Sequence, residues 1–159
     1  MTLAISSAHA DLLVALRRTD EAPRVVVIGA TALGHHVALR PTADVDLAIA
    51  ADPGRISELL QRQGWKADRR LPQRWWFGDA LVDVLPATQA AIDAGHVMLG
   101  DGHKLSTVGF DIALAHAAPV PIPGTDISVD VASLASIVLL KMVAFLDRPH
   151  ERLKDAGRR

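Results

Sequence analysis

The sequence of 159 residues contains no cysteine. This absence excludes a disulfide framework, a thiolate nucleophile and a zinc finger built on cysteine. The chain also lacks an excess of either charge, because 17 basic and 18 acidic residues give a formal net charge of −1. A protein that holds nucleic acid by bulk charge alone is therefore not expected. A hydrophobic fraction of 50% and a charged fraction of 22% also exclude wholesale disorder.

Long hydrophobic runs are absent as well. The longest, at residues 131–146, is too short to span a bilayer, and Lys141 interrupts it. Residues 1–13 show no basic leader before an apolar segment, so we expect no signal peptide, no membrane partner and a cytoplasmic location. No repeat, low-complexity tract or linker divides the sequence, and its length predicts a single domain over residues 1–159.

Hydrophobic periodicity and the positions of glycine and proline predict interleaved strands and helices. Expected helices lie at residues 6–18, 31–39, 53–63, 88–94, 110–117 and 133–147, and Pro149 closes the last. Expected strands lie at residues 24–28, 43–50, 65–71, 74–77, 80–85 and 126–131, with a hairpin at 96–108. Pro121, Pro123 and Gly124 are expected to form a turn before the last strand. This order predicts an α/β or α+β fold, with helices packed on a mixed sheet.

A glycine turn follows the first expected strand. It is not a P-loop, because Gly34 is followed by His35 and not by the lysine that grips phosphate. It also lacks one of the three glycines of a dinucleotide-binding fingerprint, because position 31 is threonine. The start of a helix still exposes backbone N–H groups to an anion. Taken alone, Gly29 is best explained as a residue that lets the chain turn.

Two aspartates, Asp44 and Asp46, alternate with Val45 and Leu47 in the second expected strand. Alternate residues of a strand share a face, so the two carboxylates point the same way, about 7 Å apart. A divalent cation would relieve their repulsion, and oxygen ligands suit magnesium. The alternative is a solvated sheet edge that carries two aspartates.

A third aspartate, Asp83, has apolar neighbours on both sides. A lone carboxylate in such a strand is costly unless a cation neutralises it. One explanation is a metal shared with Asp44 and Asp46. The competing explanation is an ion pair with Arg40 or Arg74.

Several motifs in order along the chain resemble the nucleotidyltransferase superfamily related to DNA polymerase beta. The narrower resemblance is to the AbiEii-like nucleotidyltransferases of type IV toxin–antitoxin systems, and it covers nearly the whole chain. It rests on the turn at residues 29–31 (GAT) and on segments 40–47 (RPTADVDL), 82–86 (VDVLP), 139–141 (LLK), 147–148 (DR) and 154–155 (KD).

The resemblance implies a nucleotidyltransferase fold and a set of site residues. It assigns Asp44, Asp46 and Asp83 as ligands of two Mg²⁺ ions. It assigns Gly29, Ala30 and Thr31 to the phosphates of a nucleoside triphosphate, with Lys141 reaching the triphosphate from the last helix. The alternative for Lys141 is a helix lysine whose stem lies on the core while its ammonium group is solvated. Arg40, Lys154 and Asp155 match family positions and are further candidates.

The sequence departs from the family pattern at two places. Ala30 stands where the family usually has glycine or serine. After Lys154 and Asp155 the family continues with another aspartate and a helical region, whereas here Arg158 occupies the place of the acid and the sequence stops at Arg159. We therefore expect that helical region to be short or missing.

The expected function is Mg²⁺-dependent transfer of a nucleoside monophosphate group from a triphosphate to an acceptor hydroxyl, on RNA, tRNA or protein. The resemblance also implies a toxin-like protein with an antitoxin partner. Two alternatives are a non-catalytic nucleotide-binding module of the same fold and an enzyme of the aminoglycoside-modifying type. The latter would need an acidic pocket for its acceptor. A small basic group, Arg69, Arg70 and Arg74, is either a contact for RNA or phosphate or a solvated sheet edge.

Overall fold

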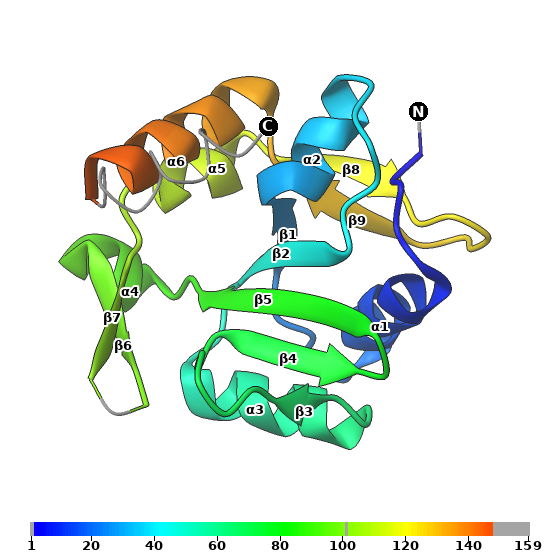
Figure 1. Cartoon of the computed structure of the whole chain (residues 1–159), viewed down its shortest axis with the longest axis horizontal. Helices are drawn as coiled ribbons and strands as arrows, with labels where there is room; N and C mark the ends of the chain where they lie inside the picture. The colour runs from blue at the N-terminus through cyan, green and yellow to red at the C-terminus, as the bar shows by residue number, and fades with distance from the viewer. Residues whose placement is uncertain (1, 101, 148–159) are drawn as a thin grey trace.

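The computed structural model describes residues 2–100 and 102–147, and Figure 1 shows their arrangement. The helices are α1 (Ser7–Arg18), α2 (Gly29–His36), α3 (Pro53–Arg62), α4 (Gln89–Ala94), α5 (Phe110–Ala115) and α6 (Leu134–Asp147). The strands are β1 (Val25–Ile28), β2 (Asp44–Ile49), β3 (Lys66–Ala67), β4 (Arg74–Phe77), β5 (Ala80–Pro86), β6 (His96–Leu99), β7 (His103–Ser106), β8 (Ala118–Pro121) and β9 (Ser128–Val131).

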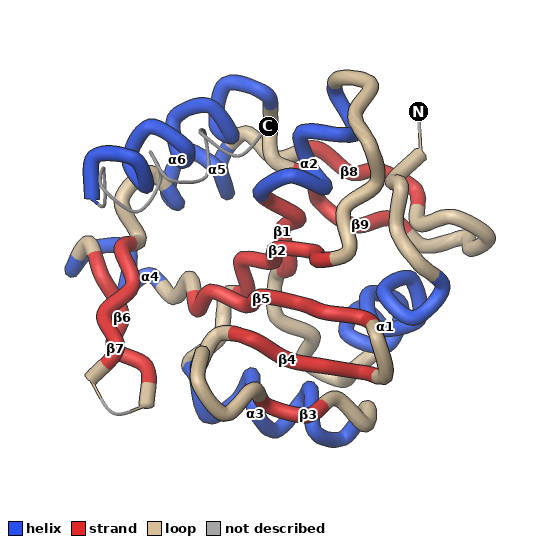
Figure 2. Tube along the Cα trace, in the orientation of Figure 1, coloured by secondary structure: helices blue, strands red, loops and turns tan. Residues whose placement is uncertain are grey.

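Seven strands form one mixed sheet in the order β3-β4-β5-β2-β1-β9-β8. The pairs β2–β5 and β1–β9 are parallel, and the other neighbouring pairs are antiparallel. Strands β6 and β7 form a separate hairpin that stands apart from the large sheet (Figure 2). The expected class, a mixed sheet flanked by helices, is confirmed.

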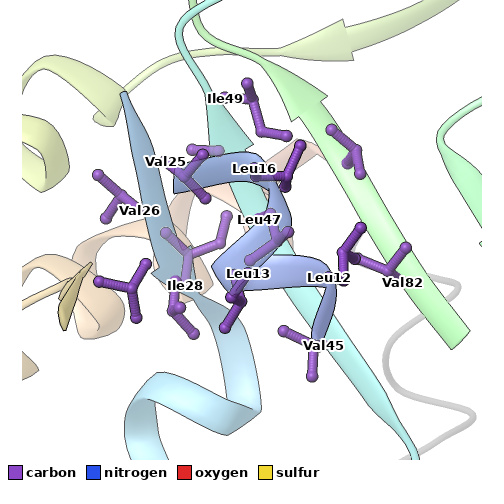
Figure 3. Close-up of a cluster of buried hydrophobic side chains, with 14 of the residues drawn as sticks. Leu12, Leu13, Leu16, Val25, Val26, Ile28, Val45, Leu47, Ile49 and Val82 are labelled. Carbon is purple, nitrogen blue, oxygen red and sulfur yellow. The ribbon is translucent and has the colours of Figure 1, made fainter. Parts of the chain in front are cut away.

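The hydrophobic core lies between the large sheet and helix α1 (Figure 3). Leu12, Leu13 and Leu16 recur at helical spacing along α1 and are almost fully buried. They meet the inward residues of the central strands. These include Val25, Val45, Leu47, Ile49 and Val82. Because strand residues alternate between faces, burying Val45 and Leu47 on α1 turns Asp44 and Asp46 to the opposite face.

Helix α1 begins where the sequence predicts. Ser6 caps it, because the Ser6 hydroxyl accepts a hydrogen bond from the backbone N–H of His9. The His9 ring is buried, with Nε2 at 2.7 Å from the carbonyl oxygen of Leu81 in β5. This contact ties α1 to the strand that carries Asp83.

The hairpin is attached through Thr107. Its hydroxyl donates to the carbonyl of Ala91 at 2.6 Å, and its backbone N–H donates to the carbonyl of Gly95 at 3.0 Å. Both acceptors lie at the carboxyl end of α4, where the last helix carbonyls have no partner within the helix. Thr107 therefore closes α4 and fixes where the β6–β7 hairpin leaves it.

Three expected elements differ from the observed ones. The expected turn is confirmed at Pro123 and Gly124 but wrong at Pro121, because Pro121 belongs to β8, a strand that the sequence analysis did not predict, and the turn lies at residues 122–127. Strand β8 is at the sheet edge, where a residue without an N–H is tolerated. Strand β3 covers only two of the residues expected at 65–71, because Asp68 turns the chain. Helix α2 covers Gly29–His36 rather than the expected 31–39, so it starts two residues earlier and ends three residues earlier.

Helix α6 is apolar on nearly all sides. Ile137 is buried toward the fold, whereas Val138, Met142, Phe145 and Leu146 are exposed. Within the described residues, none of the helices has both the length and the apolar character needed to cross a membrane. Pro149, expected to close α6, lies outside the described residues.

Candidate active site

Strand register places the site residues in one row across the sheet. Ile28 at the end of β1 pairs with Asp46 of β2, and Asp46 pairs with Asp83 of β5. Asp83 in turn pairs with Arg74 of β4. Neighbouring strands lie about 4.8 Å apart, so this register sets the spacing of the side chains in the row. The glycine turn after Ile28 begins at one end of the row, and Arg74 lies at the other.

The three aspartates gather at one place on the sheet face opposite α1. Asp44, Asp46 and Asp83 each offer a carboxylate oxygen that lies within 4.8 Å of the other two. All three side chains are half-buried. The three carboxylates come from two separate segments of the chain, and their expected convergence is confirmed.

The charge of Asp46 is held in an unfavourable environment. Burial, and then the carboxylates of Asp83 and Asp44, raise the pKa of Asp46 to about 7, although the ammonium group of Lys141 and the guanidinium of Arg74 act in the opposite sense. A dication beside Asp46 would offset both causes, because it attracts the carboxylate and neutralises its charged neighbours. Carboxylate oxygens are ligands that suit Mg²⁺, so these residues fit the metal.

Arg74 forms a two-point ion pair with Asp83. Its Nε donates to Oδ1 and its Nη2 donates to Oδ2, both at 2.9 Å. The ion pair that the sequence analysis offered as the competing explanation for Asp83 is therefore formed, and its partner is Arg74. The other candidate, Arg40, is exposed on the segment between α2 and β2. The pair does not exclude a metal ligand, because a carboxylate has about four lone-pair positions and the guanidinium uses two.

Gly29 lies directly against Asp46. Its φ of +66° belongs to the left-handed region that favours glycine, and a Cβ atom there would lie 2.8 Å from Cγ of Asp46 and closer still to Oδ2. Glycine therefore allows the start of α2 to approach the carboxylates. The next residue, Ala30, lines the same cleft as Asp46.

Thr31 is also expected to contact the phosphates, but its hydroxyl group contacts other residues of the protein. The side chain is buried, and Oγ1 lies 3.2 Å from both Thr42 Oγ1 and the carbonyl of Asp44. This contact joins α2 to the start of β2. A phosphate contact from Thr31 would therefore come from its backbone N–H.

A cleft of about 480 Å³ opens beside the row. Gly29, Ala30 and Asp46 form one side, and helix α6 forms another through Ile137, Leu140 and Lys141. Strand β7 of the hairpin forms a third side through His103–Ser106, and Figure 1 shows the hairpin on the same side of the molecule as α6. The volume is in the range of sites for small molecules and cofactors. Lys141 is exposed and lines this cleft from α6, and its expected contact with a triphosphate stays a prediction.

Several cleft residues were missed by the sequence reasoning. They are His103 and Lys104 on the hairpin and Leu71, Gln73 and Leu85 on the side of β4 and β5. No local signal marks them, since their role depends on where the hairpin and the β3–β4 segment fold back. Lys154 and Asp155 lie outside the described residues.

Two solved structures are similar to this fold at low sequence identity. The antibiotic-resistance factor ANT(2'')-Ia aligns with a TM-score of 0.60 and 15% identity, over 92% of this chain and 76% of that chain. A protein of Thermotoga maritima assigned as a nucleotidyltransferase aligns with a TM-score of 0.57 and 12% identity, over 91% of this chain and 87% of that chain. At these identities the likeness shows a nucleotidyltransferase fold.

Sequence comparison identifies the family. No relative is found among curated protein sequences. Residues 11–158, however, match the family described as "Nucleotidyl transferase AbiEii toxin, Type IV TA system", which confirms the resemblance. With nearly the whole sequence matched and the fold in agreement, the chain belongs to the AbiEii family of nucleotidyltransferases.

Proposed function

We propose that this protein transfers a nucleotidyl group from a nucleoside triphosphate to an acceptor hydroxyl, with two Mg²⁺ ions held by Asp44, Asp46 and Asp83. The observation that carries the proposal is the convergence of these carboxylates within 4.8 Å, beside the glycine turn at the edge of a cleft. When bound, Mg²⁺ at such a site stabilises the charge that develops on the attacking and leaving oxygens.

The residues around the carboxylates would hold the triphosphate. The backbone N–H groups at Gly29 and Ala30 begin a helix and favour an anion. Lys141 adds a positive charge from α6. In the reaction, a bond forms between the acceptor oxygen and the α-phosphorus, and the bond from that phosphorus to the β-phosphate bridge breaks. Pyrophosphate leaves with the electron pair, and the hydroxyl proton passes to a carboxylate of the triad.

The charges around the cleft favour an RNA or protein acceptor over a cationic antibiotic. The described residues that line the cleft include His103, Lys104 and Lys141, against two acids, Asp46 and Asp147. Asp46 belongs to the proposed metal site and is not free to bind a cation of the acceptor. An acceptor with several positive charges would need a more acidic lining. The exposed Arg69 and Arg70 on the β3–β4 segment suit phosphate groups, which makes RNA the preferred acceptor.

The family description also supports a role as a toxin of a type IV toxin–antitoxin system. We propose that modification of the acceptor is the toxic event, and that an antitoxin is the partner of the system.

A specific observation supports one other function, a nucleotide-binding module without catalysis. Arg74 already neutralises Asp83, and this weakens the attraction of Asp83 for a metal ion. Such a module would bind a triphosphate in the same cleft and transfer nothing.

The decisive experiment incubates the protein with each α-labelled nucleoside triphosphate, Mg²⁺ and cell extract. We compare the wild type with Asp46→Asn, which removes one carboxylate, and with Asp79→Asn, an exposed aspartate on the β4–β5 turn. Label should pass to a macromolecule with the wild type and Asp79→Asn, and transfer should fall at least about 100-fold with Asp46→Asn, as expected when a group that stabilises the transition state is lost. Digestion of the product with ribonuclease or protease then identifies the acceptor class.

Two results would contradict catalysis at this site. The first is transfer by Asp46→Asn at the wild-type rate. The second is no transfer by the wild type although it binds labelled triphosphate in equilibrium dialysis, which supports the binding module.

A further inference from the structure

Gln73 is a cleft residue whose hydrogen-bonding capacity the fold does not use. Its side chain lines the cleft beside Leu71 and Leu85. The amide oxygen is shielded from solvent, and no described residue donates a hydrogen bond to it. An amide oxygen that is shielded from solvent and receives no hydrogen bond is rare and costly in a native fold, and the side chain that carries it is half-buried. Its place in the cleft indicates that a bound molecule supplies the partner.

The segment that carries Gln73 is held in one conformation. Asp68 Oδ1 accepts hydrogen bonds from the backbone N–H groups of Arg70 and Leu71, at 2.7 and 3.0 Å, and its Oδ2 accepts from Trp76 Nε1 at 2.8 Å. These bonds lower the pKa of Asp68 to about 2, so the carboxylate stays ionised and keeps them near neutral pH.

The backbone of Gln73 is anchored as well. Its carbonyl accepts a hydrogen bond from the N–H of Val84 at 2.7 Å, one residue beyond Asp83 in β5. Gln73 is therefore presented at a defined position beside the third carboxylate, and little ordering remains for a ligand to impose on it.

The row of site residues has two ends, one beside the glycine turn and one beside β4, and we consider which reactant approaches each end. The glycine turn, where the phosphates would bind, follows β1, whereas Gln73 directly precedes β4. Strands β2 and β5, with the carboxylates, lie between them, so the two ends are about three strand spacings, or ~14 Å, apart. In nucleotidyl transfer the attacking oxygen and the departing pyrophosphate lie on opposite sides of the α-phosphorus. The acceptor therefore approaches from the β4 side.

We infer that Gln73 is an acceptor-binding residue, and that its side-chain amide hydrogen-bonds the acceptor next to the attacking hydroxyl. This inference rests on the proposed function. An amide is neutral and offers both a donor and an acceptor, which suits a sugar hydroxyl or a base edge rather than an isolated charge. Arg69 and Arg70, on the same segment, then lie where phosphates further along a polyanionic acceptor would pass.

The test compares Gln73→Met with a matched control, Gln63→Met. The Gln63 amide oxygen is also shielded and unpartnered among the described residues, but Gln63 closes α3 and does not line the cleft. Both changes keep the side-chain length and remove the amide. For each protein we measure the melting temperature, the binding of labelled triphosphate by equilibrium dialysis, and transfer while the concentration of cell extract is varied.

With Gln73→Met the half-saturating concentration of extract should rise about threefold to tenfold, the usual value of one hydrogen bond, with triphosphate binding unchanged. Gln63→Met should change neither quantity. Equal behaviour of the two variants would overturn the inference, and so would a change in triphosphate binding or base preference, which would assign Gln73 to the nucleotide. If the wild type transfers no label, the proposed function fails first and this inference with it.

Discussion

At the scale of single residues, Gly29 packs directly against Asp46. Gly29 has a positive φ and no room for a side chain, because the Asp46 carboxylate occupies the space a Cβ would need. Asp46 in turn has a raised pKa because it is buried among other carboxylates. The glycine that lets the chain turn is thus also the residue that lets the helix start reach the acids.

This contact predicts opposite effects for two glycines of the same helix. Gly29→Ala should lower the free energy of unfolding by about 1–3 kcal/mol, because it adds backbone strain and displaces Asp46. Gly34→Ala should raise it by about 0.5–1 kcal/mol, because Gly34 has helical backbone and open space around it. Urea unfolding followed by circular dichroism measures both. Equal stability of the two variants would show that Gly29 is not in contact with Asp46.

At the scale of elements, the site depends on how three strands and a hairpin are joined. The parallel β2–β5 pair sets Asp46 beside Asp83, and the antiparallel β4–β5 pair sets Arg74 beside Asp83. The hairpin that completes the cleft is attached at Thr107, which is almost fully buried and satisfies the end of α4. A change at Thr107 should therefore alter both the free energy of unfolding and ligand binding in the cleft.

Thr107→Val keeps the shape of the side chain and removes the hydroxyl. We expect a loss of about 1–3 kcal/mol in unfolding free energy, because the buried carbonyl of Ala91 loses its donor. We also expect weaker binding of labelled triphosphate, since the hairpin lines the cleft. The control is Thr125→Val in the exposed β8–β9 turn, because the carbonyl of Ile122 that accepts from the Thr125 hydroxyl also accepts from the backbone N–H of Thr125 and keeps that donor. A similar loss in both variants would contradict a special role for Thr107.

At the scale of the whole molecule, a metal that binds only the folded chain must stabilise it. The three carboxylates come from two strands that meet only in the folded sheet, so the unfolded chain has no such site. At a Mg²⁺ concentration 100 times the dissociation constant, the expected gain is about 2.7 kcal/mol. For a domain of this size that is roughly 5–10 °C in melting temperature.

Thermal unfolding with and without Mg²⁺ measures this gain. Asp46→Asn should unfold at the same temperature in both conditions, whereas Asp79→Asn should respond like the wild type. In the absence of metal, Asp46→Asn should be at least as stable as the wild type near neutral pH, because it removes a repelled and half-buried carboxylate. An identical response of wild type and Asp46→Asn to Mg²⁺ would place the metal elsewhere.

Much of the fold follows from local patterns that act over a few residues. The leucines of α1 at helical spacing, the alternation of Val45 and Leu47 with two aspartates, and the glycine after Ile28 each predict an element and its buried face. The sequence predictions that were wrong also have physical causes. The prolines of β8 are compatible with a strand only because that strand lies at the sheet edge, which no local pattern reveals.

The sequence by itself indicated the candidate site residues: three aspartates on apolar strands, a glycine turn and a lysine on the last helix. Their catalytic and binding roles, and the single domain over residues 1–159, stay predictions. Only the tertiary structure decided that Arg74 rather than Arg40 pairs with Asp83, and that Gln73 and the hairpin enclose the cleft. The reason is that periodicity depends on neighbours along the chain, whereas strand order and register depend on how distant segments share one core.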